Sequence, residues 1–593
     1  MKFLKLAYQA VFLNLRTKIS RVQYIMIIAS IVGLVSGLAS VLLKSMVHYL
    51  QTWIKEIPVS ALGYLLFPTI GIVATVFVVR KFFGSYIEKG IAMVLRAIAR
   101  RSSFIPLSHT YLHIATSSLT VGLGGSAGLE SPIVATGAAI GSNTARISSL
   151  NYRERTLLIA CGAAAGISAV FNAPIAGVIF AIEVLLTETI VSYFIPLIIS
   201  SVIGVLCSKI ILAESAMFNF VLQENFDYTN VPGYMLLGIL AGFISVYYAR
   251  TFTRTQTAFY NSKERQYTKA VAGGLMLMVI YFVFPPLFGE GYDSVKLVAN
   301  GTSTVIDDNT RFFSLFNDNA SLIIFTGMIV LLKPLAAAIT INSGGNGGNF
   351  APSLFTGAYL GFFFSKLVNS FGWFRIPEGN FSLAGMAGVL SGVMYCPLTA
   401  IFLIAEITNG YELFIPLMIV SSFSFFIVKS YEPYSMETKK LALEGQIFTH
   451  KKEKNILTSI NMREIIQDNY DNLSMHTSLG SLVELVKSSP RNIFAVHDEK
   501  KLFVGILELN DIKQKIFQPE LFEKITVRNL MKKPAAILYE DQDLNYVMEQ
   551  FDITQSWYLP VLTRKREFIG FISQTKLFNK YREILSSQGD LYE

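Results

Sequence analysis

A carboxylate follows a glycine-rich stretch and opens an apolar segment within the first third of the chain. The stretch Gly124-Gly-Ser-Ala-Gly-Leu-Glu130-Ser-Pro132 runs directly into apolar residues 133–140. Glycines let backbone N–H groups face a ligand closely, and the start of a following helix adds the positive end of its dipole. An ionisable residue in an apolar membrane segment is costly and is by default a functional candidate. We therefore interpret Glu130 as an anion mimic placed in an anion site.

A related stretch recurs later in the chain. Residues 130–141 match residues 350–361 in the pattern Pro-x4-Gly-Ala-x2-Gly. Residues 168–183 match residues 391–406, and both of these segments end on Glu. Short hydrophobic segments interrupted by Gly or Pro at corresponding positions of two halves are typical of transporter binding sites. We expect two structural repeats that bring two loop-to-helix starts together near the midplane of a membrane.

The composition indicates a membrane protein with a soluble tail. The 593 residues are 52% hydrophobic and 15% charged, whereas about a quarter of the residues are charged in a typical soluble domain. Long apolar stretches end near residue 430, and residues 450–593 have an ordinary soluble composition. The net charge of +9 is typical of positively charged cytoplasmic loops and does not indicate nucleic-acid binding.

The predicted fold class is an all-α polytopic membrane domain with two related repeats, followed by a cytoplasmic α/β tandem module. In the soluble part, residues 494–507 match residues 559–572, and each copy indicates strand, charged turn, strand and helix. We predict five parts: an N-terminal cytoplasmic or interfacial helix (1–22), a transmembrane domain (23–430), a linker (431–456) and two soluble repeats (457–518 and 519–593).

Metal and redox chemistry find no support in the pattern of ligating residues. Cys161, Cys207 and Cys396 lie in apolar surroundings without paired spacing, and the six histidines are scattered. We therefore expect no disulfide framework and no metal site. No nucleophile and base occur in a recognisable arrangement, so we do not expect an enzyme.

These motifs resemble those of the CLC family of chloride channels and chloride/proton antiporters. The tail resembles the paired CBS domains that many members carry, so the resemblance covers nearly the whole chain. It implies a homodimer in the lipid bilayer with one anion pathway per subunit, chloride as the transported ligand and no cofactor. We expect an inner (cell) membrane location with both termini cytoplasmic. Nitrate, fluoride and bromide stay open as the physiological anion.

Two of the family's anion-site motifs can be placed directly. The second motif, usually Gly-(Lys/Arg)-Glu-Gly-Pro, is here Gly128-Leu-Glu130-Ser-Pro, which implies that Glu130 is the gating glutamate. The third motif, Gly-x-Phe-x-Pro, is intact as Gly348-Asn-Phe350-Ala351-Pro. It implies that the backbone N–H groups of Phe350 and Ala351 face the anion. The alternatives are a carboxylate that serves only the helix dipole and a core phenylalanine.

The family's first motif and its late tyrosine are less clear. The first motif, Gly-Ser-Gly-Ile-Pro, coordinates the anion through its serine, and the best match places Lys89 at that position. Gly84-Ser85 is an alternative alignment, four residues out of register. A desolvated ammonium would bind an anion or the Glu130 carboxylate tightly, lose its proton, or snorkel to an interface instead. Tyr434 fits the late tyrosine that donates its hydroxyl to the anion, with an interfacial tyrosine as the alternative.

The residue at the family's internal proton-relay position favours a channel. The aligned residue is Val184, which cannot carry a proton, so the resemblance implies uncoupled conduction with pH- or voltage-sensitive gating by Glu130. One alternative is an anion/proton antiporter that uses the adjacent Glu183, although Glu183 and Glu406 also fit paired structural carboxylates. A second alternative is a non-conducting sensor in which a Lys89–Glu130 ion pair plugs the path.

The tail keeps only halves of the adenine-nucleotide pattern of CBS pairs. A Ser/Thr-x-x-Asp after the second strand is here Glu508-Leu-Asn-Asp511 in one copy and Ser573-Gln-Thr-Lys576 in the other. We therefore expect a structural or dimerising module, with nucleotide binding as the alternative.

Overall fold

The computed structural model describes residues 18–58, 60–84, 89–100, 103–186, 194–212, 226–300, 319–372, 375–408, 410–443, 462–542 and 544–587. The chain splits into two compact units, Met1–Ile447 and Phe448–Glu593. Most of the predicted N-terminal helix, and the part of the predicted linker beyond residue 443, lie outside the described residues.

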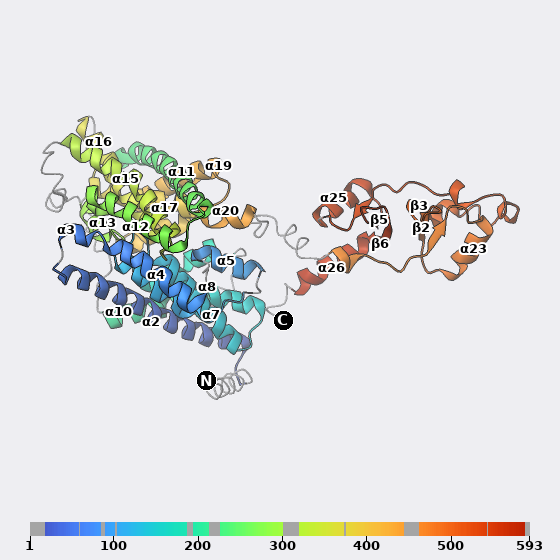
Figure 1. Cartoon of the computed structure of the whole chain (residues 1–593), viewed down its shortest axis with the longest axis horizontal. Coiled ribbons are helices and arrows are strands. Elements are labelled where there is room, and N and C mark those ends of the chain that lie inside the picture. The colour runs from blue at the N-terminus through green and yellow to red at the C-terminus, as the bar shows by residue number, and fades with distance from the viewer. Residues whose placement is uncertain are drawn as a thin grey trace. The chain divides into compact units, whose positions relative to one another are not determined.

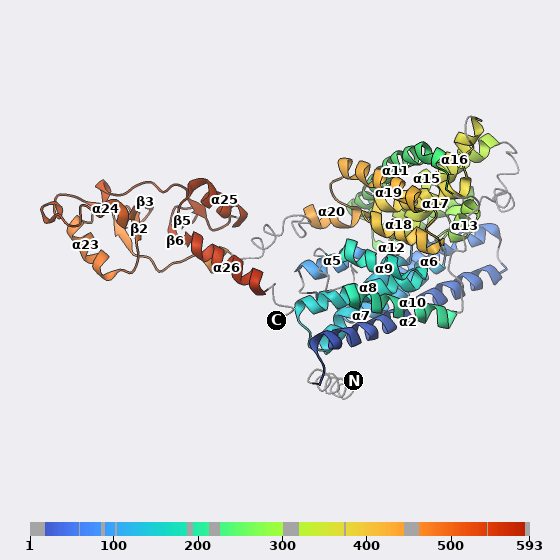
Figure 2. The same cartoon turned by 180° about the vertical axis from the view of Figure 1, so that it is seen from behind.

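The first unit is helical throughout its described part, and its two halves lie against each other (Figures 1 and 2). The first half contains α2 (Arg21–Glu56), α3 (Ala61–Tyr64), α4 (Phe67–Phe83), α5 (Gly90–Arg100), α6 (His109–Gly122), α7 (Glu130–Ile147), α8 (Tyr152–Phe171), α9 (Pro174–Phe180), the π-helical turn η1 (Ala181–Leu185) and α10 (Phe194–Leu212). The second half contains η3 (Tyr228–Asn230), α11 (Val231–Asn261), α12 (Gln266–Val283), η4 (Pro285–Leu287), α13 (Tyr292–Ala299), α15 (Asn319–Asn342), α16 (Phe350–Ser370), α17 (Glu378–Met394), α18 (Pro397–Ile407), α19 (Phe414–Tyr431) and α20 (Met436–Leu443).

The lengths of these helices suit a membrane domain with interrupted segments. Seven helices within the described ranges are long and apolar enough to cross a membrane. Others stop short of the roughly 20 residues that a span requires, such as α9 and α18, each of which begins at a proline. The backbone groups at the ends of such short helices need hydrogen-bond partners within the protein.

Glycines allow close helix contacts at equivalent places in the two repeats. A Cβ on Gly137 of α7 would lie 2.1 Å from the carbonyl oxygen of Gly162 in α8. A Cβ on Gly357 of α16 would lie 2.3 Å from the carbonyl oxygen of Gly385 in α17. Small residues permit this approach between membrane helices. The prediction of two related repeats is thereby confirmed in their packing.

The second unit contains two three-stranded sheets with the same topology. The first joins β1 (Asn472–Ser474), β2 (Ile493–His497) and β3 (Phe503–Glu508), and the second joins β4 (Leu538–Tyr539), β5 (Tyr558–Leu562) and β6 (Phe568–Ser573). In each sheet the first pair is parallel, the second is antiparallel, and the register shifts at the same place. The accompanying helices are α22 (Met462–Ile465), α23 (Leu479–Ser488), α24 (Leu509–Ile512), η6 (Pro519–Leu521), η7 (Val527–Asn529), α25 (Leu544–Thr554) and α26 (Gln574–Ser587). The predicted tandem α/β module is confirmed.

Candidate functional site

The two glycine-rich loops meet and pair with each other. Gly128 N–H donates to the Gly348 carbonyl at 2.9 Å, and Gly348 N–H donates to the Gly128 carbonyl at 2.8 Å. The segments run antiparallel where they meet, just before α7 and α16 begin. The prediction that two loop-to-helix starts converge is confirmed.

A second exchange of hydrogen bonds reinforces this junction. Ser126 N–H donates to Thr340 Oγ1 at 3.2 Å, and at the equivalent place Asn346 N–H donates to Thr120 Oγ1 at 2.9 Å. Each threonine belongs to the helix before the partner loop, α15 or α6. The loops are therefore fixed by the opposite repeat, and their backbone N–H groups are held in place before any ligand binds.

The Glu130 carboxylate lies between the two helix starts. Its side chain is 1% exposed, and Oε1 accepts a 2.5 Å hydrogen bond from the Tyr292 hydroxyl. A Cβ added to Gly128 would lie 2.1 Å from Glu130 Oε2 and 3.0 Å from the backbone nitrogen of Ala351. Oε2 accepts no hydrogen bond within the described part of the chain, and the Ala351 N–H at the start of α16 lies near enough to stabilise the negative charge of the carboxylate. An anion of similar size would find the same donors if the carboxylate moved away.

The third motif is packed tightly around this point. Phe350 and Ala351 are fully buried, and the Phe350 ring lies 5.5 Å from the Phe171 ring and 6.4 Å from the Phe180 ring, measured between centroids. The aromatic contacts hold the start of α16, so Phe350 contributes packing as well as its backbone position.

Two further polar residues at this site, Tyr292 and Glu290, were not predicted from the sequence. Gly289 N–H donates to the Gly124 carbonyl at 3.0 Å, which joins their loop to the second motif. Glu290 is 8% exposed, the Leu129 N–H faces its carboxylate, and its Oε1 accepts no hydrogen bond within the part of the chain that the structure describes. The run Gly289-Glu-Gly-Tyr after an apolar segment was the only sequence signal for this loop.

Lys333 fixes the same loop, and its charge acts on the buried Glu290 carboxylate. Its side chain is fully buried, and Nζ donates to the carbonyls of Gly289 at 2.9 Å and of Leu287 and Glu290 at 3.4 Å. The ammonium also lies 4.3 Å from the centroid of the Phe355 ring. Because a buried charge without partners is very costly, these four contacts account for its position.

Lys89 contacts the third-motif loop rather than Glu130. Its Nζ donates to the Gly345 carbonyl at 2.7 Å and to the Ile341 carbonyl at 3.3 Å. Lys89 and Glu130 are both described, and no ion pair joins them. The Lys89–Glu130 ion pair of the second alternative is therefore not formed, because the ammonium is satisfied by one carbonyl at the end of α15 and one in the loop that follows it.

Glu183 caps the start of α18, and Glu406, near the end of α18, caps the start of α9. Glu183 accepts from the N–H groups of Leu398 and Thr399 at 3.1 and 2.9 Å, and from Thr399 Oγ1 at 2.8 Å. Glu406 accepts from the N–H groups at the start of α9 at 3.0 and 2.8 Å. These contacts support the structural interpretation. The role of Glu183 as a relay, and that of the adjacent, partly buried Val184 as a lost relay, stay predictions.

The late tyrosine and the nucleotide half-motif have less distinctive surroundings. Tyr434 is 38% exposed, which fits an anion ligand and an interfacial tyrosine equally, so its role stays a prediction.

In the second unit, Asp511 and Glu508 bind Lys532 Nζ at 2.9 and 3.2 Å. Although desolvation lowers it, the pKa of Lys532 is raised overall by these two carboxylates. The Asp511 carboxylate is thus already engaged within the module.

Comparisons with known proteins agree with this geometry. The family model described as voltage gated chloride channel matches residues 70–429, and that of the CBS domain matches residues 527–583. Chloride channel protein CLC-e of Arabidopsis thaliana is 26% identical over 82% of this chain and 75% of its own. The H(+)/Cl(-) exchange transporter ClcA of Citrobacter koseri is 27% identical over 67% of this chain and 83% of its own.

Solved structures share the fold. A slow cyanobacterial Cl-/H+ antiporter superposes with a TM-score of 0.61 and 21% identity, covering 71% of this chain and 97% of its own. A eukaryotic CLC transporter superposes with a TM-score of 0.60 and 16% identity, covering 93% and 97%.

Proposed function

We propose that this protein is a chloride channel gated by Glu130. The chain belongs to the voltage gated chloride channel family, the CLC family, whose members are membrane anion transporters. The observation that carries the proposal is the position of the Glu130 carboxylate, buried between two helix starts and close to the Ala351 N–H.

The proposed mechanism is an exchange between carboxylate and anion. The ionised Glu130 side chain occupies the site, held by the Tyr292 hydroxyl and the start of α16. Protonation removes its charge, and a high anion concentration competes for the same N–H groups; either event lets the side chain leave. Chloride then takes its place, with the backbone around Phe350 replacing part of the hydration shell. Conduction is therefore sensitive to pH, and to voltage through the charge that moves.

Coupled anion/proton exchange is the second candidate. It is favoured by relatives whose names describe H(+)/Cl(-) exchange, and by Glu290, a second acid beside the gate. Val184 favours uncoupled conduction instead, because valine cannot relay a proton from the inner side. The proposal includes a homodimer in an inner membrane with both termini cytoplasmic, and no bound nucleotide in the CBS module.

The deciding experiment measures chloride efflux and proton movement together, in liposomes containing the purified protein at several pH values. Chloride efflux without proton movement supports the channel, and a fixed ratio of protons to chloride supports the exchanger. The variant Glu130→Gln should raise flux at neutral pH and flatten its pH dependence. If Glu130→Gln leaves both flux and pH dependence unchanged, the gating role is wrong.

A further inference from the structure

A second carboxylate faces a helix start inside the first unit. Gly90, the first residue of α5, has a φ of +71°, and a Cβ there would lie 3.5 Å from Glu437 Oε2. The Ala92 N–H and the Asn349 side chain donate toward the same carboxylate. Gly90 therefore leaves room for a negative group at the positive end of an 11-residue helix.

The Asn349 amide is oriented by a contact on its other side. Asn349 Oδ1 accepts a 3.2 Å hydrogen bond from the Tyr248 hydroxyl, and both side chains are buried. An amide whose oxygen is engaged in this way turns its NH2 group in the other direction, toward Glu437. This places Glu437 next to the third motif, because Asn349 directly precedes Phe350.

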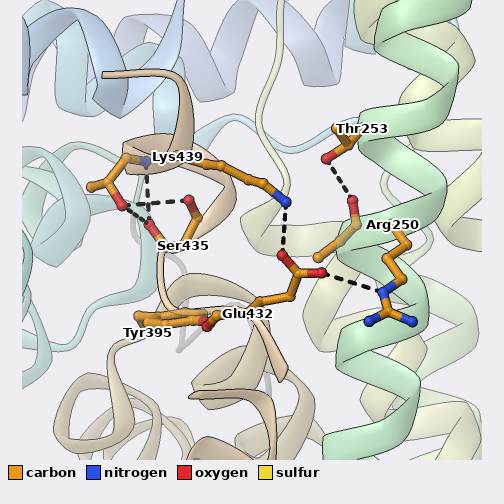
Figure 3. A network of polar contacts seen from close by, with 8 residues as sticks. Arg250, Thr253, Tyr395, Glu432, Ser435 and Lys439 are labelled. Atoms are coloured by element: carbon orange, nitrogen blue, oxygen red, sulfur yellow. Dashed lines mark hydrogen bonds and ion pairs between the residues drawn. The ribbon is translucent and has the colours of Figure 1, made fainter. Parts of the chain in front are cut away.

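A network of polar contacts fixes the start of α20, the helix that carries Glu437 (Figure 3). Glu432 binds Lys439 at 2.7 Å and Arg250 of α11 at 3.2 Å, and its carbonyl accepts from the Tyr395 hydroxyl. Ser435 Oγ accepts from the Thr438 N–H at 3.3 Å at the first turn. Glu437 lies between these anchors in the sequence, and its side chain is partly buried.

Glu437 and Glu130 are therefore arranged alike on either side of one motif. Glu130 faces the N–H of Ala351, and Glu437 faces Asn349 and the N–H of Ala92. Each carboxylate occupies a place that attracts an anion.

We propose that Glu437 is a second gating carboxylate, which occupies an anion position between α5 and the third motif and must leave before an anion binds there. This inference rests on the proposed passage of anions along Phe350.

The test is the number of chloride ions bound per chain, measured by isothermal titration of the purified full-length protein. Glu437→Gln and Glu437→Ala should each bind about one more chloride than the unchanged protein. The control is Glu378→Gln, which loses a 2.9 Å ion pair with Lys366 at the start of another helix and should bind the original number. An unchanged chloride number in both Glu437 variants overturns the proposal.

A further variant tests the anchor without altering the carboxylate. Glu432→Gln removes the ion pairs with Lys439 and Arg250, so chloride should displace Glu437 more easily and the number of chloride ions bound should rise toward that of the Glu437 variants, by up to about one. An unchanged chloride number contradicts the role of the network. Measurements of chloride flux separate the two proposals. If the Glu437 variants bind an added chloride but no form of the protein conducts, the proposed transport function is wrong. If the protein conducts but the Glu437 variants bind no added chloride, the second gate is wrong.

Discussion

Replacing Tyr292 with phenylalanine removes a single hydroxyl group from the Glu130 site. Tyr292 is the first residue of α13, it is 8% exposed, and its hydroxyl donates to Glu130 Oε1 at 2.5 Å. Tyr292→Phe keeps the ring and its packing, so the main loss is the contact that holds the ionised carboxylate in the anion position.

The size of the effect follows from that one contact. A hydrogen bond to a charged group contributes about 1.5–3 kcal/mol. Since about 1.4 kcal/mol is a factor of ten in an equilibrium constant, chloride should displace the carboxylate about ten- to a hundredfold more easily. The chloride concentration that gives half-maximal flux should fall by a similar factor.

The assay is chloride flux from liposomes over a range of chloride concentrations at constant ionic strength. The matched control is Tyr24→Phe, which also removes a buried hydroxyl, here one that donates to the Ser148 carbonyl at 3.2 Å. Ser148 lies at the far end of α7, about 27 Å from Glu130 at 1.5 Å per residue. An unchanged half-maximal concentration in Tyr292→Phe, or an equal change in Tyr24→Phe, would refute the reasoning.

Three further predictions concern the loops and their supports. Gly128→Ala should lower flux at least about tenfold, because its Cβ would lie 2.9 Å from the Ala351 Cβ and 3.0 Å from the Ala351 nitrogen and would fill the anion position even after Glu130 has left. Gly410→Ala, whose nearest atom lies at 4.0 Å, should conduct normally, and comparable flux in the two variants would show that the close approach is not needed. Glu183→Ala should lower the free energy of unfolding by about 1–3 kcal/mol, since three donors at the start of α18 lose their acceptor. The melting temperature in detergent should fall, and an unchanged melting temperature would contradict the capping role. Lys89→Met should weaken chloride binding about two- to thirtyfold in titration calorimetry, because the carbonyls at and just beyond the end of α15 lose their compensating charge. Chloride binding of equal strength in the variant would place Lys89 outside the anion path.

Much of the fold and part of the site could be predicted because their signals are local. A glycine-rich loop, Glu130 and a helix with proline in its first turn follow one another within nine residues. The loop and the proline recur in the second copy, with Phe350 in place of the carboxylate, and this recurrence predicts a paired site. The β-strand repeats of the tail are equally local, since alternating apolar residues around a charged turn define each hairpin.

The partners of Glu130 and the second carboxylate depend on contacts between distant parts of the chain. Tyr292 is 162 residues from Glu130, and Lys89 is 256 residues from the carbonyl that it binds. No local pattern specifies which carbonyl or carboxylate a buried polar group will meet. The packing of complete helices decides this, because the high cost of burying an unpaired charge leaves only those arrangements in which a partner is within reach.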